Sequence, residues 1–213
     1  MSKLNDLEKK NEELQLKQFI NFTQAEVEDF LGKMNDEMFV KAMNVIDDSK
    51  KNNGRLHITG IGKPSHVAEY ISALLSSTGP PCYFLDGTEA VHGSAGQVNP
   101  QDVVIAISNS GGTVELRNTV EALKKIGVKI IGVTGNLDSW LAKNSDAVLY
   151  AGVTNEGDDT NKPPRLSIVA EILALQCLSI LLQSRVNLTM DNYYLWHPGG
   201  ALGEQAKKEL ADS

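Results

Sequence analysis

The stretch AISNSGGT, Ala106–Thr113, places hydroxyl side chains and glycines between an apolar run and a helical pattern. Its two adjacent glycines allow a tight turn and a close approach of the backbone to a ligand. Ser108, Ser110 and Thr113 add hydroxyl donors, and the free N–H groups of the following helix favour an anion. A Walker lysine and spacing are absent, and the same residue types also cap helices. The stretch therefore predicts either a phosphate-sized anion cradle or simple helix capping.

A lysine and two histidines lie in other glycine-containing loops. Lys63 follows GIG, where its charge would neutralise an anionic ligand unless it is an ordinary solvated surface residue. His92 in AVHGS and His197 in LWHPGGALG carry imidazoles, which titrate near neutrality and act as general acids or bases. His57 and His66 fall within a predicted strand and helix, where packing or exposure is the simpler expectation.

Three glutamates accompany these groups. Glu89 precedes His92, Glu115 follows the hydroxyl-rich loop, and Glu156 lies in a polar segment further along the chain. A glutamate on its own is usually an exposed, solvated residue. A carboxylate and an imidazole in one pocket, however, suit proton transfer at a carbon next to a carbonyl. The catalytic interpretation therefore depends on whether the fold brings these loops together.

The elements that must position these loops alternate between strand and helix after an N-terminal helical region, 2–50. The predicted strands cover about 55–60, 81–86, 102–108, 129–134 and 147–152, and the main helices 64–78, 113–126 and 165–185, with short helical segments near 88–95 and 138–144. Four of the strands are apolar nearly throughout, which indicates a parallel sheet covered on both faces. We therefore predict a doubly wound α/β fold with a five-stranded parallel sheet. Ligands of such folds bind at the carboxyl ends of the strands, where all of these loops emerge.

The composition of the 213-residue chain excludes several function classes. A net charge of −7 without a basic cluster argues against nucleic acid as a partner. Cys82 and Cys177 form no disulfide framework or zinc motif, and the first ten residues lack the apolar core of a signal peptide. The apolar run 168–182 is interrupted by polar residues and indicates a buried helix rather than a membrane span. We expect a cytoplasmic protein.

Five segments together resemble the sugar isomerase (SIS) domain, most closely that of arabinose-5-phosphate isomerases. They are GIGKPSH, STGPPCYFLDGTEAVHGSAG, DVVIAISNSGGTVEL, IGVTGN and HPGGALG. The resemblance covers about residues 35–205, so we expect an isomerase domain at 35–213 preceded by a helical extension at 1–34. It implies aldose–ketose isomerisation of D-arabinose 5-phosphate to D-ribulose 5-phosphate through an enediol, without a metal or cofactor. It also implies a homo-oligomer, a dimer of dimers, whose subunits share their sites.

The resemblance assigns roles to residues one by one. It implies that the catalytic residues are His197, Glu115, Glu156, Lys63 and His92. It implies that Ser108, Ser110 and Thr113 form the phosphate loop, and we expect Gly62, Asn109, Gly111 and Glu89 also to contact the substrate or its phosphate. Arg165 is expected there too, because its guanidinium can bind a phosphate, although it departs from the family pattern. His197 is the first choice for the acid–base residue, and the division of roles among the others stays open.

The sequence departs from the family pattern in four segments. The family's GxGKSGH is GIGKPSH here, Ser94 replaces an acidic residue, and Gly112 stands where glutamate is common. A Thr/Ser-rich segment that the family uses near the phosphate is PPRLSI here, with Arg165 and Leu166 in it. Because the sequence ends ten residues after Gly203, we expect the protein to lack the paired CBS domains of many relatives. Another pentose or hexulose phosphate as substrate, or a noncatalytic sugar-phosphate-binding protein, remains the alternative.

Overall fold

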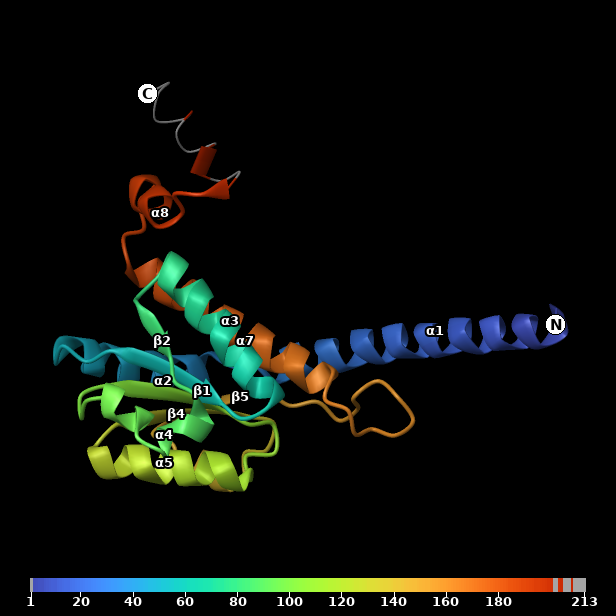
Figure 1. Cartoon of the computed structure of the whole chain (residues 1–213), viewed down its shortest axis with the longest axis horizontal. Coiled ribbons are helices and arrows are strands. Elements are labelled where there is room, and N and C mark those ends of the chain that lie inside the picture. The colour runs from blue at the N-terminus through green and yellow to red at the C-terminus, as the bar shows by residue number, and fades with distance from the viewer. Residues whose placement is uncertain (1, 201–202, 205–207, 209–213) are drawn as a thin grey trace.

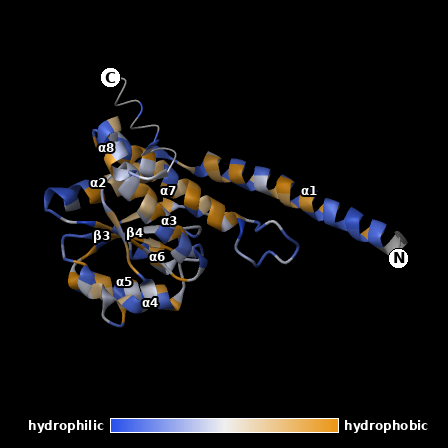
Figure 2. Ribbon diagram, turned by 45° about the horizontal axis from the view of Figure 1, so that its top comes forward, coloured by the Kyte–Doolittle hydropathy of each residue, from blue (hydrophilic) through white to orange (hydrophobic). Residues whose placement is uncertain are grey.

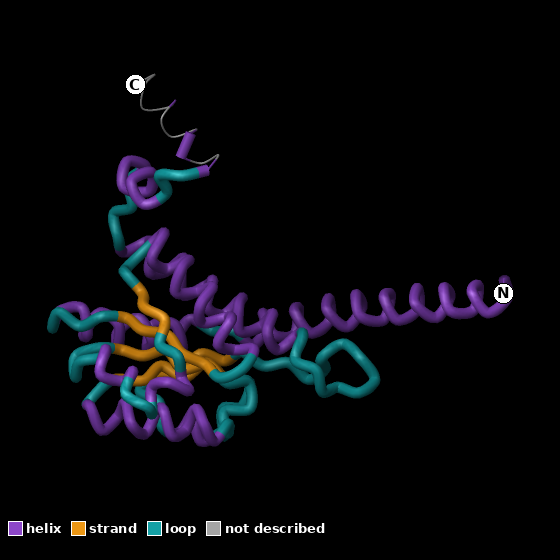
Figure 3. Tube along the Cα trace, in the orientation of Figure 1, coloured by secondary structure: helices purple, strands orange, loops and turns teal. Residues whose placement is uncertain are grey.

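The computed structural model describes residues 2–200, 203–204 and 208, and its centre is a five-stranded parallel sheet (Figure 3). The strands are β1 (Leu56–Gly60), β2 (Cys82–Phe84), β3 (Val103–Ile107), β4 (Lys129–Thr134) and β5 (Ala147–Tyr150). The helices are α1 (Ser2–Lys33), α2 (Asp36–Lys51), α3 (Lys63–Thr78), α4 (Gly87–Ala90), α5 (Val114–Ile126), α6 (Trp140–Lys143), α7 (Leu166–Arg185) and α8 (Met190–Trp196), with a 3₁₀ turn at Ser94–Gln97. The order β2-β1-β3-β4-β5, with every pair parallel, confirms the predicted fold class.

The sheet is apolar on both faces because helices cover both of them (Figure 1). Along β3, Ile105 and Ile107 face the layer of α2, α3 and α7, whereas Val104 and Ala106 face the layer of α4, α5 and α6. All four side chains are completely buried. This two-sided burial is the physical reason for the continuous apolar runs in the sequence.

The N-terminal helical region predicted at 2–50 is two helices rather than one. The break falls at Asn35, whose side chain accepts a hydrogen bond from the Met38 N–H at 3.1 Å and so caps α2. The second half of α1 packs on the rest of the molecule. The Phe30 ring is buried, Glu26 accepts two hydrogen bonds from Thr154, and the Phe19 ring lies beside Gly157. The beginning of α1 extends away from the sheet (Figure 1).

Helix α7 is the most apolar long helix among the described residues (Figure 2). It is the one described helix whose length and composition would suffice to cross a membrane. Half of that apolar window is buried, because α7 packs against α3 and the sheet. The burial agrees with the expectation of a core helix.

Candidate functional site

A cavity of about 250 Å³ lies at the carboxyl ends of β1 and β3. The strand order reverses between these two strands, because β2 lies beyond β1 whereas β4 and β5 lie beyond β3. Ligands of doubly wound sheets bind at such a switch point. The cavity is lined by Ile61, Pro64, Ile107, Ser108, Asn109, Ser110, Thr113, Leu116, Glu156, Lys162, Pro164, Ser167, Ile168 and Glu171. Five of the residues expected at the site therefore meet there: Ser108, Asn109, Ser110, Thr113 and Glu156.

The hydroxyl-rich loop is held by hydrogen bonds within itself. The Ser108 hydroxyl lies 3.2 Å from the Thr113 hydroxyl and accepts a hydrogen bond from the Gly111 N–H at 3.1 Å. Gly111 has a φ of +62°, and a Cβ there would overlap the Ser139 side chain. Only glycine fits this turn, so Gly111 shapes the loop although it does not line the cavity.

The same loop leads into the N-terminus of α5. Thr113 is the N-cap residue, and its side chain makes no capping hydrogen bond. The first-turn N–H groups of α5 are therefore not occupied by that side chain, and the positive end of the helix dipole favours an anion beside them. Ser110 is exposed at the cavity, and its hydroxyl accepts a hydrogen bond from the Gly112 N–H at 3.3 Å. The geometry therefore suits a phosphate-sized anion.

Glu156 is buried at the cavity and caps α7. One of its carboxylate oxygens, Oε2, accepts hydrogen bonds from the N–H groups of Arg165 at 2.6 Å and Ser167 at 3.1 Å. A carboxylate is the favoured group at a helix N-terminus, because it satisfies free N–H groups and the dipole together. Glu156 thus fixes the start of α7 beside the hydroxyl-rich loop.

Two polar residues of α7 also line the cavity, and the sequence analysis missed both as site residues. Glu171 is completely buried, and neither of its carboxyl oxygens has a hydrogen-bond partner among the described residues. Burial, together with the nearby Glu156, raises the pKa of Glu171 to about 8. The Ser167 hydroxyl, one helical turn earlier, is likewise buried without a partner. The available signal was the isolated acidic residue in an otherwise apolar segment.

Lys63, Gly62 and Arg165 lie next to this cavity rather than in it. Lys63 and Arg165 line a neighbouring hollow of about 370 Å³, which shares Pro164 and Ile168 with the first cavity. Gly62 is the N-cap of α3, with a φ of +68°. The Arg165 guanidinium pairs with Asp158, and hydrogen bonds from Thr160 and Arg165 hold the pKa of that carboxyl at about 2. In this arrangement Arg165 is engaged by a carboxylate.

Glu115, Glu89 and His92 do not line the cavity. Glu115 is exposed in the first turn of α5, and Glu89 is exposed in α4. His92 is exposed in the turn that follows α4, where its N–H donates to the Glu89 carbonyl. These three residues belong to the helical layer of α4 and α5 (Figure 1). Their expected roles stay predictions.

His197 lies at the opposite end of α7 from the cavity. It caps the C-terminus of α8, where its Nδ1 atom lies 2.7 Å from the Tyr193 carbonyl and its ring stacks on the Tyr193 ring. Helix α7 has 20 residues and is therefore about 30 Å long. The residues of α7 that line the cavity belong to its first two turns, Ser167, Ile168 and Glu171. Helix α8 follows the other end of α7 (Figure 1). Within one chain, His197 does not reach the cavity.

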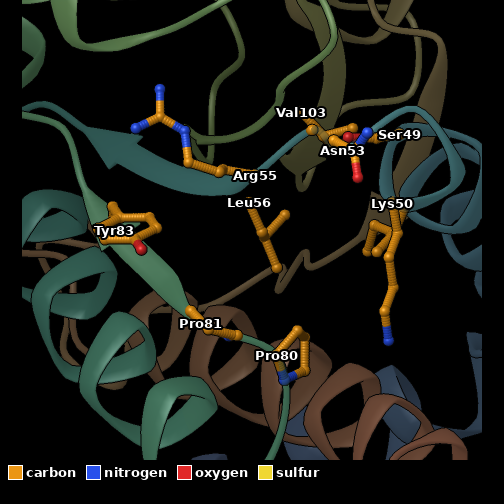
Figure 4. A pocket seen from close by; sticks show the side chains of 11 residues that line it. Ser49, Lys50, Asn53, Arg55, Leu56, Pro80, Pro81, Tyr83 and Val103 are labelled. Carbon is orange, nitrogen blue, oxygen red and sulfur yellow. The ribbon is translucent and has the colours of Figure 1, made fainter.

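A second hollow, of about 420 Å³, lies at the amino ends of β1, β2 and β3 (Figure 4). Arg55 and Tyr83 line it, and the guanidinium lies 5.8 Å from the centre of the Tyr83 ring. Behind them the buried Asp102 carboxylate accepts hydrogen bonds from Arg55 and lies 3.0 Å from His57 Nε2. Burial lowers the pKa of His57, although Asp102 opposes that effect. This network joins β1 to the start of β3 at the amino ends of the strands. Ligands of doubly wound folds bind at the carboxyl ends, so the network is not part of the expected site.

The fold and the first cavity define a doubly wound α/β protein with a polar hollow, suited to a small anion, at its switch point. The model of the SIS domain family matches residues 50–181, and the chain belongs to this family. No group of three or more metal-ligating side chains gathers in the described part of the chain.

Relatives with known names agree with this assignment. The arabinose 5-phosphate isomerase KdsD of Pseudomonas aeruginosa is 36% identical over 186 residues, which are 87% of this chain and 56% of that protein. KpsF of Escherichia coli, also an arabinose 5-phosphate isomerase, is 35% identical over 188 residues, 88% of this chain and 57% of that protein. The chain thus spans little more than half the length of these relatives. A solved structure of c3406 from E. coli CFT073 in complex with arabinose 5-phosphate superimposes with a TM-score of 0.80 at 30% identity, covering 93% of this chain and all of the other.

Proposed function

We propose that this protein isomerises a sugar phosphate, D-arabinose 5-phosphate to D-ribulose 5-phosphate. The observation that carries the proposal is the cavity, in which Ser108, Ser110 and Thr113 meet the N-terminus of α5 at the switch point. The names of the relatives support the sugar, and the sugar-phosphate complex of c3406 supports the ligand class. The cytoplasm is the proposed location.

The reaction is a proton transfer between neighbouring carbons. A base removes the proton from C2 of the open-chain aldose. The electron pair left on C2 forms the C1–C2 double bond of an enediol. Reprotonation at C1 and movement of the hydroxyl proton from O2 to O1 then give the ketose, so the step needs no redox partner. The cradle holds the phosphate at the other end of the sugar, and this fixed binding positions C1 and C2.

The acid–base group of the proposal is His197, contributed by a second copy of the chain. The length of α7 separates His197 from the cavity of its own chain. We therefore propose a homo-oligomer, a dimer of dimers, in which His197 of one subunit serves the cavity of a neighbour. Lys63, at the start of α3, faces the neighbouring hollow and is the proposed partner of the sugar oxygens. Glu115, Glu156 and His92 are proposed to assist, Glu156 at least by fixing the start of α7.

The decisive test is an assay of ketose formation from a panel of phosphosugars that includes arabinose 5-phosphate. We expect turnover with arabinose 5-phosphate above all others. Binding of phosphosugars without any ketose product would instead favour a noncatalytic sensor. Turnover restricted to another member of the panel would keep the reaction and replace the substrate.

Three variant experiments test the roles of residues. His197→Ala should abolish turnover while phosphosugar affinity stays within about tenfold, and unchanged turnover would remove His197 from the mechanism. Mixed oligomers of inactive Lys63→Ala and His197→Ala subunits should regain activity, since some sites then combine the two intact residues. Ser110→Ala should weaken binding of the phosphorylated sugar more than binding of the free sugar.

A further inference from the structure

We propose that Glu171 is a ligand-binding residue of the cavity, whose neutral carboxyl group donates a hydrogen bond to the phosphate of the phosphosugar. This inference rests on the proposed function for the identity of the ligand. The residue was not among those expected from the sequence or implied by the family resemblance. It adds a donor on α7 to the hydroxyl groups on the opposite wall.

The first support is the burial of an unpartnered carboxyl group. Glu171 has no exposed surface, and both of its oxygens lack a hydrogen-bond partner in the described part of the chain. A buried polar group without a partner is costly, so buried carboxyl groups are normally hydrogen-bonded. A ligand oxygen in the adjoining cavity would supply the missing partner.

The second support is the placement of Glu171 relative to the cradle. Ser167 and Glu171 are four residues apart and therefore lie on one face of α7. Both line the cavity that Ser108 and Thr113 line from the loop after β3. Within the described residues the Ser167 hydroxyl also lacks a hydrogen-bond partner, so this face of α7 presents two unsatisfied polar groups to one hollow. Two walls of the cavity thus offer donors to the same space.

The third support is the charge around the carboxyl group. From the loop before α7, Glu156 and Lys162 line the cavity, and Glu156 raises the pKa of Glu171 further. Helix α3 lines the cavity with Pro64, which carries no charge, whereas its Lys63 lines the neighbouring hollow. From α1 the buried Glu26 is engaged by Thr154. Burial is the larger cause of the raised pKa, which is about 8, so Glu171 is mainly protonated at neutral pH.

A protonated carboxyl group can donate a hydrogen bond to a phosphate oxygen, whereas an ionised one would repel the phosphate. Phosphate binding and protonation of Glu171 should therefore favour each other. With a pKa of about 8, the protonated fraction of the free protein falls roughly 30-fold between pH 7 and pH 9.5. The affinity for a phosphosugar should fall by a similar factor over that range.

The experiment measures the affinity of the full chain for arabinose 5-phosphate and for inorganic phosphate by calorimetry at several values between pH 7 and pH 9.5. Wild type, Glu171→Gln and Glu171→Leu are compared, with Gln176→Leu as a control. Gln176 lies on the same helix but bonds to the Tyr70 hydroxyl outside the cavity. Dividing each wild-type affinity by the Glu171→Gln affinity at the same pH removes the titration of the ligand and of other residues.

We expect Glu171→Gln, whose amide is a donor at every pH, to bind within about threefold of wild type at pH 7. The affinity of wild type divided by the affinity of Glu171→Gln should then fall at least tenfold between pH 7 and pH 9.5. Glu171→Leu should bind at least tenfold more weakly at pH 7, and Gln176→Leu should match wild type. Runs at pH 8 in buffers of different ionisation enthalpy should show proton uptake in wild type that Glu171→Gln lacks.

Parallel pH profiles of wild type and Glu171→Gln would overturn this inference and leave the proposed function standing. Unchanged affinity in Glu171→Leu would overturn it as well. Inorganic phosphate could bind with the expected fall in the affinity ratio of wild type to Glu171→Gln, while no phosphosugar is turned over. That result would overturn the proposed function and leave the role of Glu171 standing. Failure of wild type to bind either ligand would overturn both.

Discussion

Replacing Glu171 by glutamine should stabilise the free protein, and the gain should grow with pH. The carboxyl group is completely buried and has no hydrogen-bond partner among the residues that the structure describes, and burial raises its pKa from 4.5 to about 8. The folded protein therefore holds a proton that the unfolded chain releases between these values. The free energy of unfolding then falls as the pH rises from about 4.5 to about 8. Glutamine removes this ionisation and keeps the size of the side chain.

The magnitude follows from the two pKa values. Each pH unit between them costs the folded state about 1.4 kcal/mol. Relative to pH 4.5, ionisation of this carboxyl group lowers the free energy of unfolding by about 3 kcal/mol at pH 7 and about 4 kcal/mol at pH 9. Native domains are stable by roughly 5–15 kcal/mol, so either value is readily measured.

The assay is urea unfolding of wild type and Glu171→Gln at pH 4.5, 7 and 9, without ligand. Glu28→Gln serves as the control, because Glu28 is an exposed carboxylate on α1. The difference between Glu171→Gln and wild type should rise by about 3 kcal/mol from pH 4.5 to pH 7, whereas Glu28→Gln should follow wild type throughout. A difference that does not change with pH would refute the assignment of a neutral, buried carboxyl group in the folded protein.

Three other perturbations have expected outcomes. Because burial lowers the pKa of His57, the unfolded chain takes up that proton first, so stability should fall below pH 6.5. This loss of stability at low pH should be smaller in the His57→Gln variant. Both proteins should carry Glu171→Gln, because titration of Glu171 has the opposite effect on stability, and the free energy of unfolding is measured with urea. Asp102→Ala should lower the free energy of unfolding by about 3–5 kcal/mol, since it leaves buried donors and the Arg55 charge without their acceptor. Gly111→Ala should lower the free energy of unfolding, measured with urea, by at least about 1–3 kcal/mol, because alanine is strained at this positive φ. It should also abolish phosphate binding, measured by calorimetry, because the new Cβ overlaps Ser139 and displaces the hydroxyl-rich loop.

The features predicted correctly from the sequence are those that depend on local pattern. The apolar runs of β3 and β4 indicate strands covered on both faces, and their buried side chains show why. The hydroxyl-rich loop is recognisable because the turn at Gly111 and the start of α5 both require particular residue types in sequence. The break in the N-terminal helical region was missed, since the Asn35 cap is one polar residue among many.

The site residues that were missed depend on tertiary contacts. Glu171 interrupts an apolar helix, a pattern that by itself indicates only an amphipathic or buried segment. Its significance appears when the fold buries both oxygens beside the cradle. Glu156 was expected at the site from the resemblance, but its hydrogen bonds to the start of α7 follow from how that loop returns to the sheet. The position of His197 depends on α8, which the sequence analysis did not assign.

Among the helices that begin at the cavity, α5 and α7 have N-termini that differ in their openness to the phosphate. At α7 the N–H groups of Arg165 and Ser167 are already occupied by the Glu156 carboxylate, which also offsets the helix dipole. At α5 the Thr113 side chain makes no capping bond, so of these two termini that of α5 is open to an incoming anion. The phosphate should therefore lie against α5 and be approached from α7 by side chains alone. A second carboxylate on that wall would repel the phosphate, so keeping Glu171 neutral lets α7 close the cavity with a hydrogen-bond donor.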